Sequence, residues 1–143
     1  MSNPAKLEKV LYTATASAVN REGRVSSSDG NLDVQLSVPK GLGGPGGSGT
    51  NPEQLFAAGY SACFGSALAH VAKAKGIKTG PVTITATVNI GPVGAGFGLS
   101  AELVAAIPEL ARDQAQALLE AAHQVCPYSN ATRGNIEVAI RLG

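Results

Sequence analysis

The sequence has few charged residues and almost no excess of either sign. Charged side chains make up 15% of the 143 residues, below the roughly 25% typical of soluble domains, and the net charge is +1. No run or stripe of basic residues occurs, which argues against nucleic acid as a partner. The low charge, together with 18 glycines and many alanines, indicates more buried surface than one small domain would bury. We therefore expect an obligate oligomer.

The sequence also lacks a secretory segment and a dividing linker. The opening residues, MSNPAKLEK, contain no apolar core of a signal peptide, so we expect a cytoplasmic protein. The length and the absence of a linker predict a single domain over residues 1–143. An uncharged stretch before Lys73 is long enough to suggest a membrane span. Its Gln, Ser and His residues and its many small side chains argue against one.

Cysteine is scarce, since Cys63 and Cys126 are the only two. In a cytoplasmic protein such a pair is more often catalytic or redox-sensing than a structural staple. One alternative is two unrelated buried thiols, because free cysteine is among the most buried residue types. A zinc site that adds His70 and His123 is a weaker alternative, because these residues lack the paired short spacings of zinc ligands.

One long apolar helix carries the first cysteine. Residues 51–75, NPEQLFAAGYSACFGSALAHVAKAK, predict a helix with Asn51 as N-cap, Pro52 in the first position and Gln54 completing a capping box. Inside its ends the helix has no charged residue, so no face is an obvious water face. Its many Gly, Ala and Ser residues keep the surface thin around Cys63, which suits close packing against another backbone.

The remaining pattern predicts an α+β fold with antiparallel sheet, in the order βββ-α-ββ-α-β. Alternating apolar and polar residues predict strands at residues 10–19, 24–28, 32–38, 82–90, 99–107 and 135–142. Residues 20–23 predict a hairpin turn with Gly23 available for positive φ, and Asp29-Gly30 predicts another turn. A second, amphipathic helix runs from Pro108 to Cys126, where Pro127 ends it. The glycine-rich residues 41–49 lack the lysine of a phosphate-binding loop and predict a mobile connection.

The two cysteines differ in the support available to a thiolate. Cys126 lies at a helix C-terminus, where the negative end of the helix dipole disfavours a thiolate. Cys63 lies in mid-helix, and burial would raise its pKa above the usual value of about 8.5. A nucleophilic Cys63 therefore needs a cation, above all an arginine, which stays charged when buried and then needs a carboxylate. The candidates are Arg21, Arg24, Arg112, Arg133 and Arg141, with Glu53 as the acid nearest the buried helix.

The segments around both cysteines resemble one known family. NPEQLFAAGYSACF around Cys63 and AAHQVCPYSNATRGN around Cys126 are similar to the two signature segments of the organic hydroperoxide resistance proteins (Ohr) of the OsmC/Ohr superfamily. LYTATASA, SSSDGNLDVQLSVP and NIEV also resemble that family, so the resemblance covers nearly the whole chain. It implies an OsmC-like α+β fold and an intertwined homodimer in which each chain packs its long helix against the other.

The resemblance also implies a thiol peroxidase that reduces organic hydroperoxides, including those of fatty acids, to alcohols. The Cys63 thiolate would attack the O–O bond and become a sulfenic acid, and Cys126 would then form a disulfide with it. A dihydrolipoyl dithiol on a lipoylated protein would reopen the disulfide, with no resident cofactor or metal. Arg21 matches the family arginine that holds the thiolate, and Glu53 matches the carboxylate that orients this arginine. Arg24 remains a substitute, because the same turn carries two arginines three apart.

Glu53 and Cys63 are ten residues apart on the predicted helix, which separates them by about 15 Å and points them in different directions. One arginine would have to stretch to serve both. We therefore hypothesise that Arg21 and Glu53 reach the thiol from the partner subunit, with the active site at a dimer interface.

The neighbouring residues allow both structural and functional interpretations. The aromatic residues around the thiol are core by the plainer interpretation and substrate contacts for an apolar hydroperoxide by the other: Phe56, Tyr60 and Phe64. The residues after Cys126 are expected to form a loop that holds it in place: Tyr128, Asn130, Thr132 and Arg133. Structural roles are expected for His70 and His123.

Other functions also remain open. Acyl transfer through Cys63 would need a His or Asp relay, and neither histidine is placed by a motif to serve. A dimer that binds an apolar ligand without catalysis would leave both cysteines inert. The third alternative function is that of an OsmC-type peroxidase with a different substrate preference.

Overall fold

The computed structural model describes residues 4–143. Residues 1–3, the start of the stretch that predicts no signal peptide, lie outside the described residues. The chain divides into two compact units, Met1–Asn51 and Pro52–Gly143, and each is described by itself.

The first unit is an antiparallel sheet of three short strands. β1 (Ala16–Ala18) pairs with β2 (Arg24–Ser27), and β2 pairs with β3 (Asp33–Gln35). The three predicted strands are confirmed, although each is shorter than predicted. Of the described residues 4–51, only Val25 and Leu36 are buried. So small a sheet buries too little apolar surface to be stable alone.

Both predicted turns of this sheet are present, but one glycine has a different role from the predicted one. Asn20 takes the positive φ of the first turn, 53°, and Gly23 does not. Gly23 is needed for space instead, because a side chain there would overlap the backbone carbonyl of Val19. Gly30 takes a φ of 78° in the second turn, where an L side chain would be strained.

The glycine-rich residues 41–49 are tied back to the sheet. The loop starts with one helical turn, η1 (Lys40–Leu42). Gly46, at a φ of 75°, donates its N–H to the Val38 carbonyl over 2.9 Å. Thr50 then pairs with Leu36 in a parallel bridge. The loop thus leaves the chain segment that follows β3 and returns to pair with it.

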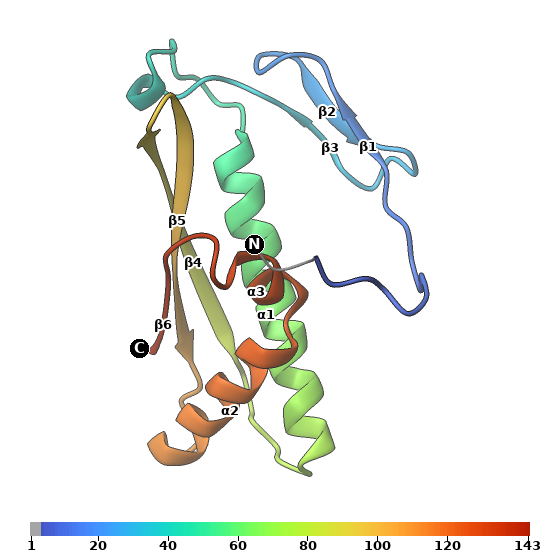
Figure 1. The fold of residues 1–143 in the computed structure, drawn as a ribbon, viewed down its shortest axis with the longest axis vertical. Helices are drawn as coiled ribbons and strands as arrows, with labels where there is room; N and C mark the ends of the chain where they lie inside the picture. The colour runs from blue at the N-terminus through green and yellow to red at the C-terminus, as the bar shows by residue number, and fades with distance from the viewer. Residues whose placement is uncertain (1–3) are drawn as a thin grey trace. The chain divides into compact units, whose positions relative to one another are not determined.

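The second unit packs helices against one face of a three-stranded sheet (Figure 1). α1 (Pro52–Ala74) lies against β4 (Thr83–Val93), which pairs with β5 (Gly96–Ala106). α2 (Arg112–Val125) contacts α1 and β6 (Val138–Leu142). The largest fully buried apolar side chains of this core are Tyr60, Phe64, Leu68, Leu103, Leu118 and Leu119.

The sheet of this unit is mixed. β4 and β5 form the predicted antiparallel hairpin, but β6 joins β5 in parallel, from Ala101↔Val138 to Ala105↔Leu142. The prediction of antiparallel sheet is therefore wrong for this last strand. The chain leaves the end of β5, crosses the sheet through the helices and returns to the starting end, as a parallel connection requires.

The end of the chain contains a helix that was predicted as a loop. α2 ends at Val125, one residue before the predicted end at Cys126, and it begins at Arg112 rather than at Pro108. Residues after Cys126 form α3 (Pro127–Thr132) instead of a loop. Cys126 has extended backbone, which the following proline favours, and Pro127 then fits the first position of the new helix. Cys126 therefore ends one helix and begins the next.

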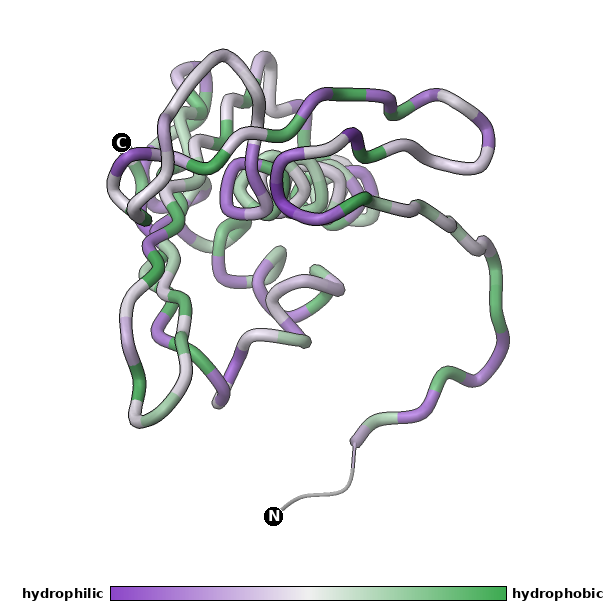
Figure 2. Tube along the Cα trace, turned by 90° about the horizontal axis from the view of Figure 1, so that it is seen from above, coloured by the Kyte–Doolittle hydropathy of each residue, from purple (hydrophilic) through white to green (hydrophobic). Residues whose placement is uncertain are grey.

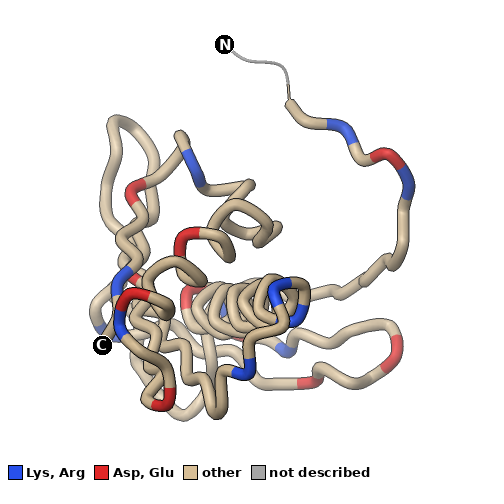
Figure 3. Tube along the Cα trace, turned by 90° about the horizontal axis from the view of Figure 1, so that it is seen from below, with Lys and Arg blue, Asp and Glu red and all other residues tan. Residues whose placement is uncertain are grey.

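The apolar character of α1 is that of a core helix. By length and composition alone α1 is long and apolar enough to cross a membrane, a test that core helices of soluble proteins also pass. It is mostly pale green in Figure 2, and in Figure 3 its charges lie only toward its ends. Tyr60, Phe64 and Leu68 are buried in the core of the second unit, yet only 33% of the most apolar stretch of α1 is buried within the chain. Small apolar residues of this helix, among them Ala58, Ala62 and Ala69, are left exposed.

Candidate functional site

The structure brings the two cysteines together within the second unit. The Sγ atom of Cys126 lies 3.6 Å from the Sγ atom of Cys63, and both are free thiols. A disulfide bond of about 2.05 Å needs only a small approach from there. Cys126 is fully buried, whereas Cys63 is partly exposed. The two are therefore neighbours of unequal access and not unrelated buried thiols.

The surroundings of Cys63 disfavour its thiolate. Burial is the largest cause and raises the pKa of Cys63 above its ordinary value. The backbone N–H of Tyr128, in the first turn of α3, lowers this pKa, and the neighbouring Cys126 raises it. A thiolate at Cys63 consequently needs a positive charge that α1 itself does not carry, because α1 has no Lys or Arg before Lys73.

An aromatic cluster lies beside the thiols. The ring centroids of Phe56 and Tyr60 on α1 are 6.1 Å apart, and the ring of Tyr128 on α3 lies 5.9 Å and 5.7 Å from them. Tyr60 is fully buried and Phe56 partly buried. Phe64 is also fully buried, in the core that contacts Cys63. The cluster gives the thiols an apolar wall built from both helices.

Gly59 makes room for this cluster. A Cβ atom at Gly59 would lie 2.7 Å from the Tyr128 hydroxyl oxygen and 3.1 Å from Cε2 of its ring. The close approach of α3 to α1 thus depends on a missing side chain. The run of small residues in the sequence indicated such an approach, but not which element would make it.

Buried hydroxyls join the same two helices next to the sulfur atoms. The Tyr60 hydroxyl lies 2.8 Å from Ser129 Oγ and 3.2 Å from Thr132 Oγ1. Ser129 is fully buried and Thr132 is 6% exposed. Thr132 was expected to help hold Cys126, but Ser129 was not recognised, because its role depends on the helix that replaces the predicted loop.

Several of the candidate arginines have partners elsewhere. Arg24 forms an ion pair of 2.8 Å with Asp33 and also donates to the Asp33 backbone carbonyl. Arg141 lies 3.5 Å from Glu102, and Arg133 donates to Asn130 and to the His123 carbonyl. Arg21 belongs to the first unit, whereas Glu53 belongs to the second with both cysteines. The roles of Arg21 and Glu53 stay predictions.

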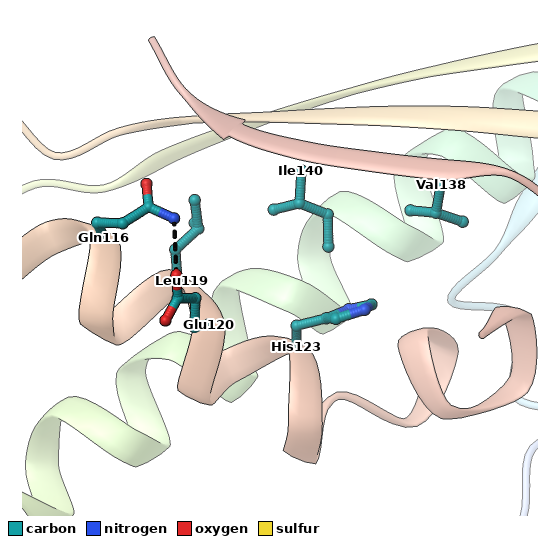
Figure 4. A pocket seen from close by; sticks show the side chains of 6 residues that line it. All are labelled: Gln116, Leu119, Glu120, His123, Val138 and Ile140. Atoms are coloured by element: carbon teal, nitrogen blue, oxygen red, sulfur yellow. Dashed lines mark hydrogen bonds between the residues drawn. The ribbon is translucent and has the colours of Figure 1, made fainter. Parts of the chain in front are cut away.

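A hollow of about 320 Å³ lies between α2 and β6 (Figure 4). Its lining comprises Gln116, Leu119, Glu120, His123, Val138 and Ile140. The Nδ1 atom of His123 is buried here without a hydrogen-bond partner. Burial lowers the pKa of His123, and the charge of Arg133 lowers it further. Within residues 4–143, no three His, Cys, Asp or Glu residues gather in a way that could hold a metal ion.

Comparison with known proteins places the chain in a family. The family profile of OsmC-like proteins matches residues 44–141. The organic hydroperoxide resistance protein of Xanthomonas axonopodis pv. citri (strain 306) is 56% identical over 140 residues, which cover 96% of this chain and 99% of that protein. The organic hydroperoxide resistance protein OhrB of Bacillus subtilis (strain 168) is 45% identical, over 92% of this chain and 98% of that protein.

A solved structure agrees with the sequence matches. The crystal structure of an organic hydroperoxide resistance protein from Vibrio cholerae, with captopril bound in one of its active sites, superposes with a TM-score of 0.91. It is 49% identical, and the match covers 96% of this chain and 95% of that one. The predicted α+β OsmC-like fold is thereby confirmed, and the chain belongs to the organic hydroperoxide resistance family of OsmC-like proteins.

Proposed function

We propose that this protein is a cysteine-based peroxidase that reduces organic hydroperoxides, including those of fatty acids, to alcohols. The observation that carries the proposal is the pair of thiols 3.6 Å apart, one partly exposed and the other fully buried. Cys63 is the cysteine that a substrate from solvent can contact. Cys126 is fully buried, so its sulfur can react with the neighbouring Cys63 but not with a bulky substrate. Unequal access of this kind suits an attacking and a resolving cysteine.

The reaction balances with these two sulfur atoms. The Cys63 thiolate attacks one peroxide oxygen, the O–O bond breaks, and the alkoxide leaves and takes up a proton, giving an alcohol and Cys63 sulfenic acid. The Cys126 sulfur then attacks the Cys63 sulfur, and the S–OH bond breaks to give water and the disulfide. A dithiol of the dihydrolipoyl class returns both cysteines to thiols and leaves as its own cyclic disulfide. We place this reductant on a lipoylated protein in the cytoplasm.

Arg21 is the cation that we assign to the Cys63 thiolate, with Glu53 as its orienting carboxylate. Burial raises the pKa of Cys63, so a fixed positive charge is needed for attack near neutral pH. Arg24, which pairs with Asp33, is the alternative cation. Both Arg21 and Glu53 act, in this proposal, on the thiol of the partner subunit.

Phe56, Tyr60 and Phe64 form the apolar surroundings that favour an organic hydroperoxide over hydrogen peroxide. Phe56 is only partly buried, so it is the one of the three best placed to touch the organic part of the substrate. Tyr60 and Phe64 are fully buried and would act by shaping the wall behind it.

The active form in this proposal is a homodimer. Only 33% of the most apolar stretch of α1 is buried within the chain, and Leu7, Val10, Leu11 and Tyr12 are between 67% and 85% exposed. A second copy that packs along α1 would cover this helix, whose thin surface suits close contact between backbones.

The experiment that tests the proposal mixes the reduced protein with cumene hydroperoxide and follows thiol loss and intact mass. Wild type should lose two thiols and two mass units of hydrogen as the Cys63–Cys126 disulfide forms. Cys63→Ser should not react. Cys126→Ser should stop at the sulfenic acid of Cys63 or pass to its over-oxidised forms.

The same experiment separates the other functions. A wild-type protein whose thiols do not respond to hydroperoxide would refute the peroxidase and leave a non-catalytic binder or an acyl-transfer enzyme. A disulfide that dihydrolipoamide reopens no faster than glutathione would refute the assigned reductant alone. Faster oxidation by hydrogen peroxide than by cumene hydroperoxide would refute the substrate class.

A further inference from the structure

Three buried residues, Tyr60, Ser129 and Thr132, form a cluster of hydroxyls between α1 and α3. Tyr60 precedes Cys63 by three residues on α1, and Ser129 follows Cys126 by three residues near the start of α3. Residues three apart on a helix share a face. The hydroxyl contacts of 2.8 Å and 3.2 Å therefore run beside the 3.6 Å contact between the sulfurs.

The hydrogen atoms of this cluster can be placed from its geometry. Thr132 Oγ1 donates to the Ser129 backbone carbonyl over 3.3 Å, so toward Tyr60 it acts as the acceptor. The Tyr60 hydroxyl then donates to Thr132, and the Ser129 hydroxyl donates to Tyr60. Each hydroxyl donates once and none is left unpaired, which is the condition under which a buried polar cluster stabilises a fold.

α3 needs such a fastening to stay in place. It has six residues, too few for a helix that is stable by itself, and it begins with a proline that lacks an N–H. Arg133, just after it, ties its end to α2 through Asn130 and the His123 carbonyl. The hydroxyl cluster links the side chains of α3 to α1, the helix that carries Cys63, in addition to the contact of the Tyr128 backbone N–H with Cys63.

We propose that Tyr60, Ser129 and Thr132 are positioning residues that hold Cys126 within bonding distance of Cys63. They thereby make disulfide formation faster than the over-oxidation of Cys63. The cluster and the disulfide join the same two helices, so each makes the other easier to form. In the reaction, Cys126 attacks the sulfenic sulfur of Cys63 and water leaves. A second peroxide competes for that same sulfur and yields sulfinic acid. This part of the inference rests on the proposed function.

The first test does not depend on peroxidase activity. The effective concentration of Cys126 toward Cys63 is measured by equilibrating the protein with reduced and oxidised dithiothreitol. Tyr60→Phe removes one hydroxyl and keeps the ring, and Thr132→Val removes one and keeps the shape. We expect each to lower the effective concentration by about tenfold, which corresponds to about 1.4 kcal/mol. Thr132→Ser, which keeps the hydroxyl, should retain most of the wild-type value.

A matched control lies away from the thiols. Ser100 on β5 accepts a hydrogen bond of 3.1 Å from Asn89, so Ser100→Ala also removes one bonded hydroxyl. This variant should leave the dithiothreitol equilibrium unchanged. A wild-type equilibrium in both Tyr60→Phe and Thr132→Val would overturn the inference. If Tyr60→Phe does not fold, the comparison of Thr132→Val with Thr132→Ser decides.

The second test measures the competition directly. After one addition of cumene hydroperoxide, the ratio of sulfinic acid to disulfide at Cys63 is read by mass spectrometry. We expect this ratio to rise about tenfold in Tyr60→Phe and Thr132→Val and to stay at the wild-type value in Ser100→Ala, because slower disulfide formation leaves more time for the second peroxide. An unreactive wild type would refute the proposed function, whereas a reactive wild type with equal ratios in all variants would refute the positioning role alone.

Discussion

The reactivity of Cys63 depends on two opposed influences on one sulfur atom. Burial raises the pKa of this thiol, whereas the N–H of Tyr128 lowers it. Because the largest of these influences disfavours the thiolate, the local environment alone would leave most of the thiol protonated at neutral pH. A charged side chain from outside α1 is therefore the decisive missing contribution, and its identity can be tested by titration.

Arg21→Ala should raise the pKa of Cys63 further, and thereby lower the rate of reaction with cumene hydroperoxide at neutral pH. An opposite charge beside an ionising group shifts its pKa by about one unit or more, so the expected loss is about tenfold or more. Since only the thiolate reacts, the rate of the variant should recover as pH rises through the higher pKa. The measurement is the rate of thiol oxidation as a function of pH.

Arg24→Ala is the matched control for this titration. The Arg24 ion pair with Asp33 is more than half exposed on both sides, and such pairs stabilise a fold by about 1 kcal/mol at most. Its pH profile should follow wild type. A larger shift in Arg24→Ala than in Arg21→Ala would reverse the assignment of the cation.

Two glycines of α1 form a contrasting pair, because Gly59 faces Tyr128 on α3 and Gly65 faces Ile84 on β4. In a helix interior, alanine is more favourable than glycine by about 0.8–1.0 kcal/mol. A Cβ at Gly65 would lie 3.7 Å from Ile84 Cγ1, an ordinary contact, so Gly65→Ala should raise the free energy of unfolding by about 1 kcal/mol. Gly59→Ala has the same propensity gain, but its Cβ meets the ring of Tyr128.

Gly59→Ala should therefore be less stable than Gly65→Ala by about 1–2 kcal/mol, because Tyr128 must leave its contacts with Phe56 and Tyr60, worth about 0.5–1.5 kcal/mol each. Both are measured by urea unfolding at one protein concentration. If Gly65→Ala is the destabilised variant, then another backbone must approach α1 at Gly65.

His123 gives the contact between α2 and β6 a pH dependence of definite sign. Burial and the charge of Arg133 lower the pKa of His123 in the folded protein, so the fold favours its neutral form. The corresponding stability is present above the unfolded pKa of about 6.5 and is lost as pH falls through the lower folded pKa. His123→Leu, with Leu119, Val138 and Ile140 around it, should make unfolding less sensitive to acid. An unchanged acid dependence in this variant, measured by urea unfolding across pH, would contradict the prediction.

Local pattern was enough to predict most elements and the antiparallel pairing of neighbouring strands, but not the pairing of the last strand. The alternation of residues 82–90 and the apolar run after Asn51 predicted β4 and α1, because periodicity and capping act within a few residues. The parallel pairing of β6 and the helix after Cys126 escaped prediction, because both depend on where the chain returns in space. Pro127 was interpreted only as a helix stop, although proline also begins helices.

The thiol pair could be predicted only through resemblance. Spacing along the chain does not predict that two residues 63 positions apart are in contact. The distance of 3.6 Å between the sulfur atoms of Cys63 and Cys126 results from the packing of α2 and α3 on α1. Ser129 could not be recognised at all, since a serine in a loop carries no signal until that loop is a helix facing Tyr60.

The two units differ in how well they could stand alone. The second buries a continuous core, whereas only Val25 and Leu36 are buried in residues 4–51. The first unit therefore depends on other surfaces for its order. A homodimer would supply such surfaces, and it allows a test of which chain provides Arg21.

Two variants with little or no activity at neutral pH should restore activity when they share a dimer. Cys63→Ser keeps Arg21 but has no nucleophile, and Arg21→Ala keeps the nucleophile but lacks its cation. If Arg21 serves the partner's thiol, a mixed dimer has one complete site of two, so the isolated mixed dimer should have about half of wild-type peroxidase activity and a randomly exchanged mixture about a quarter. Co-expression with two affinity tags isolates the mixed dimer, and cumene hydroperoxide consumption is measured against each parent variant. If Arg21 instead serves the thiol of its own chain, the mixed dimer has no complete site and stays as inactive as its parents. A monomer at all concentrations in sedimentation would contradict the arrangement in which Arg21 serves the partner's thiol.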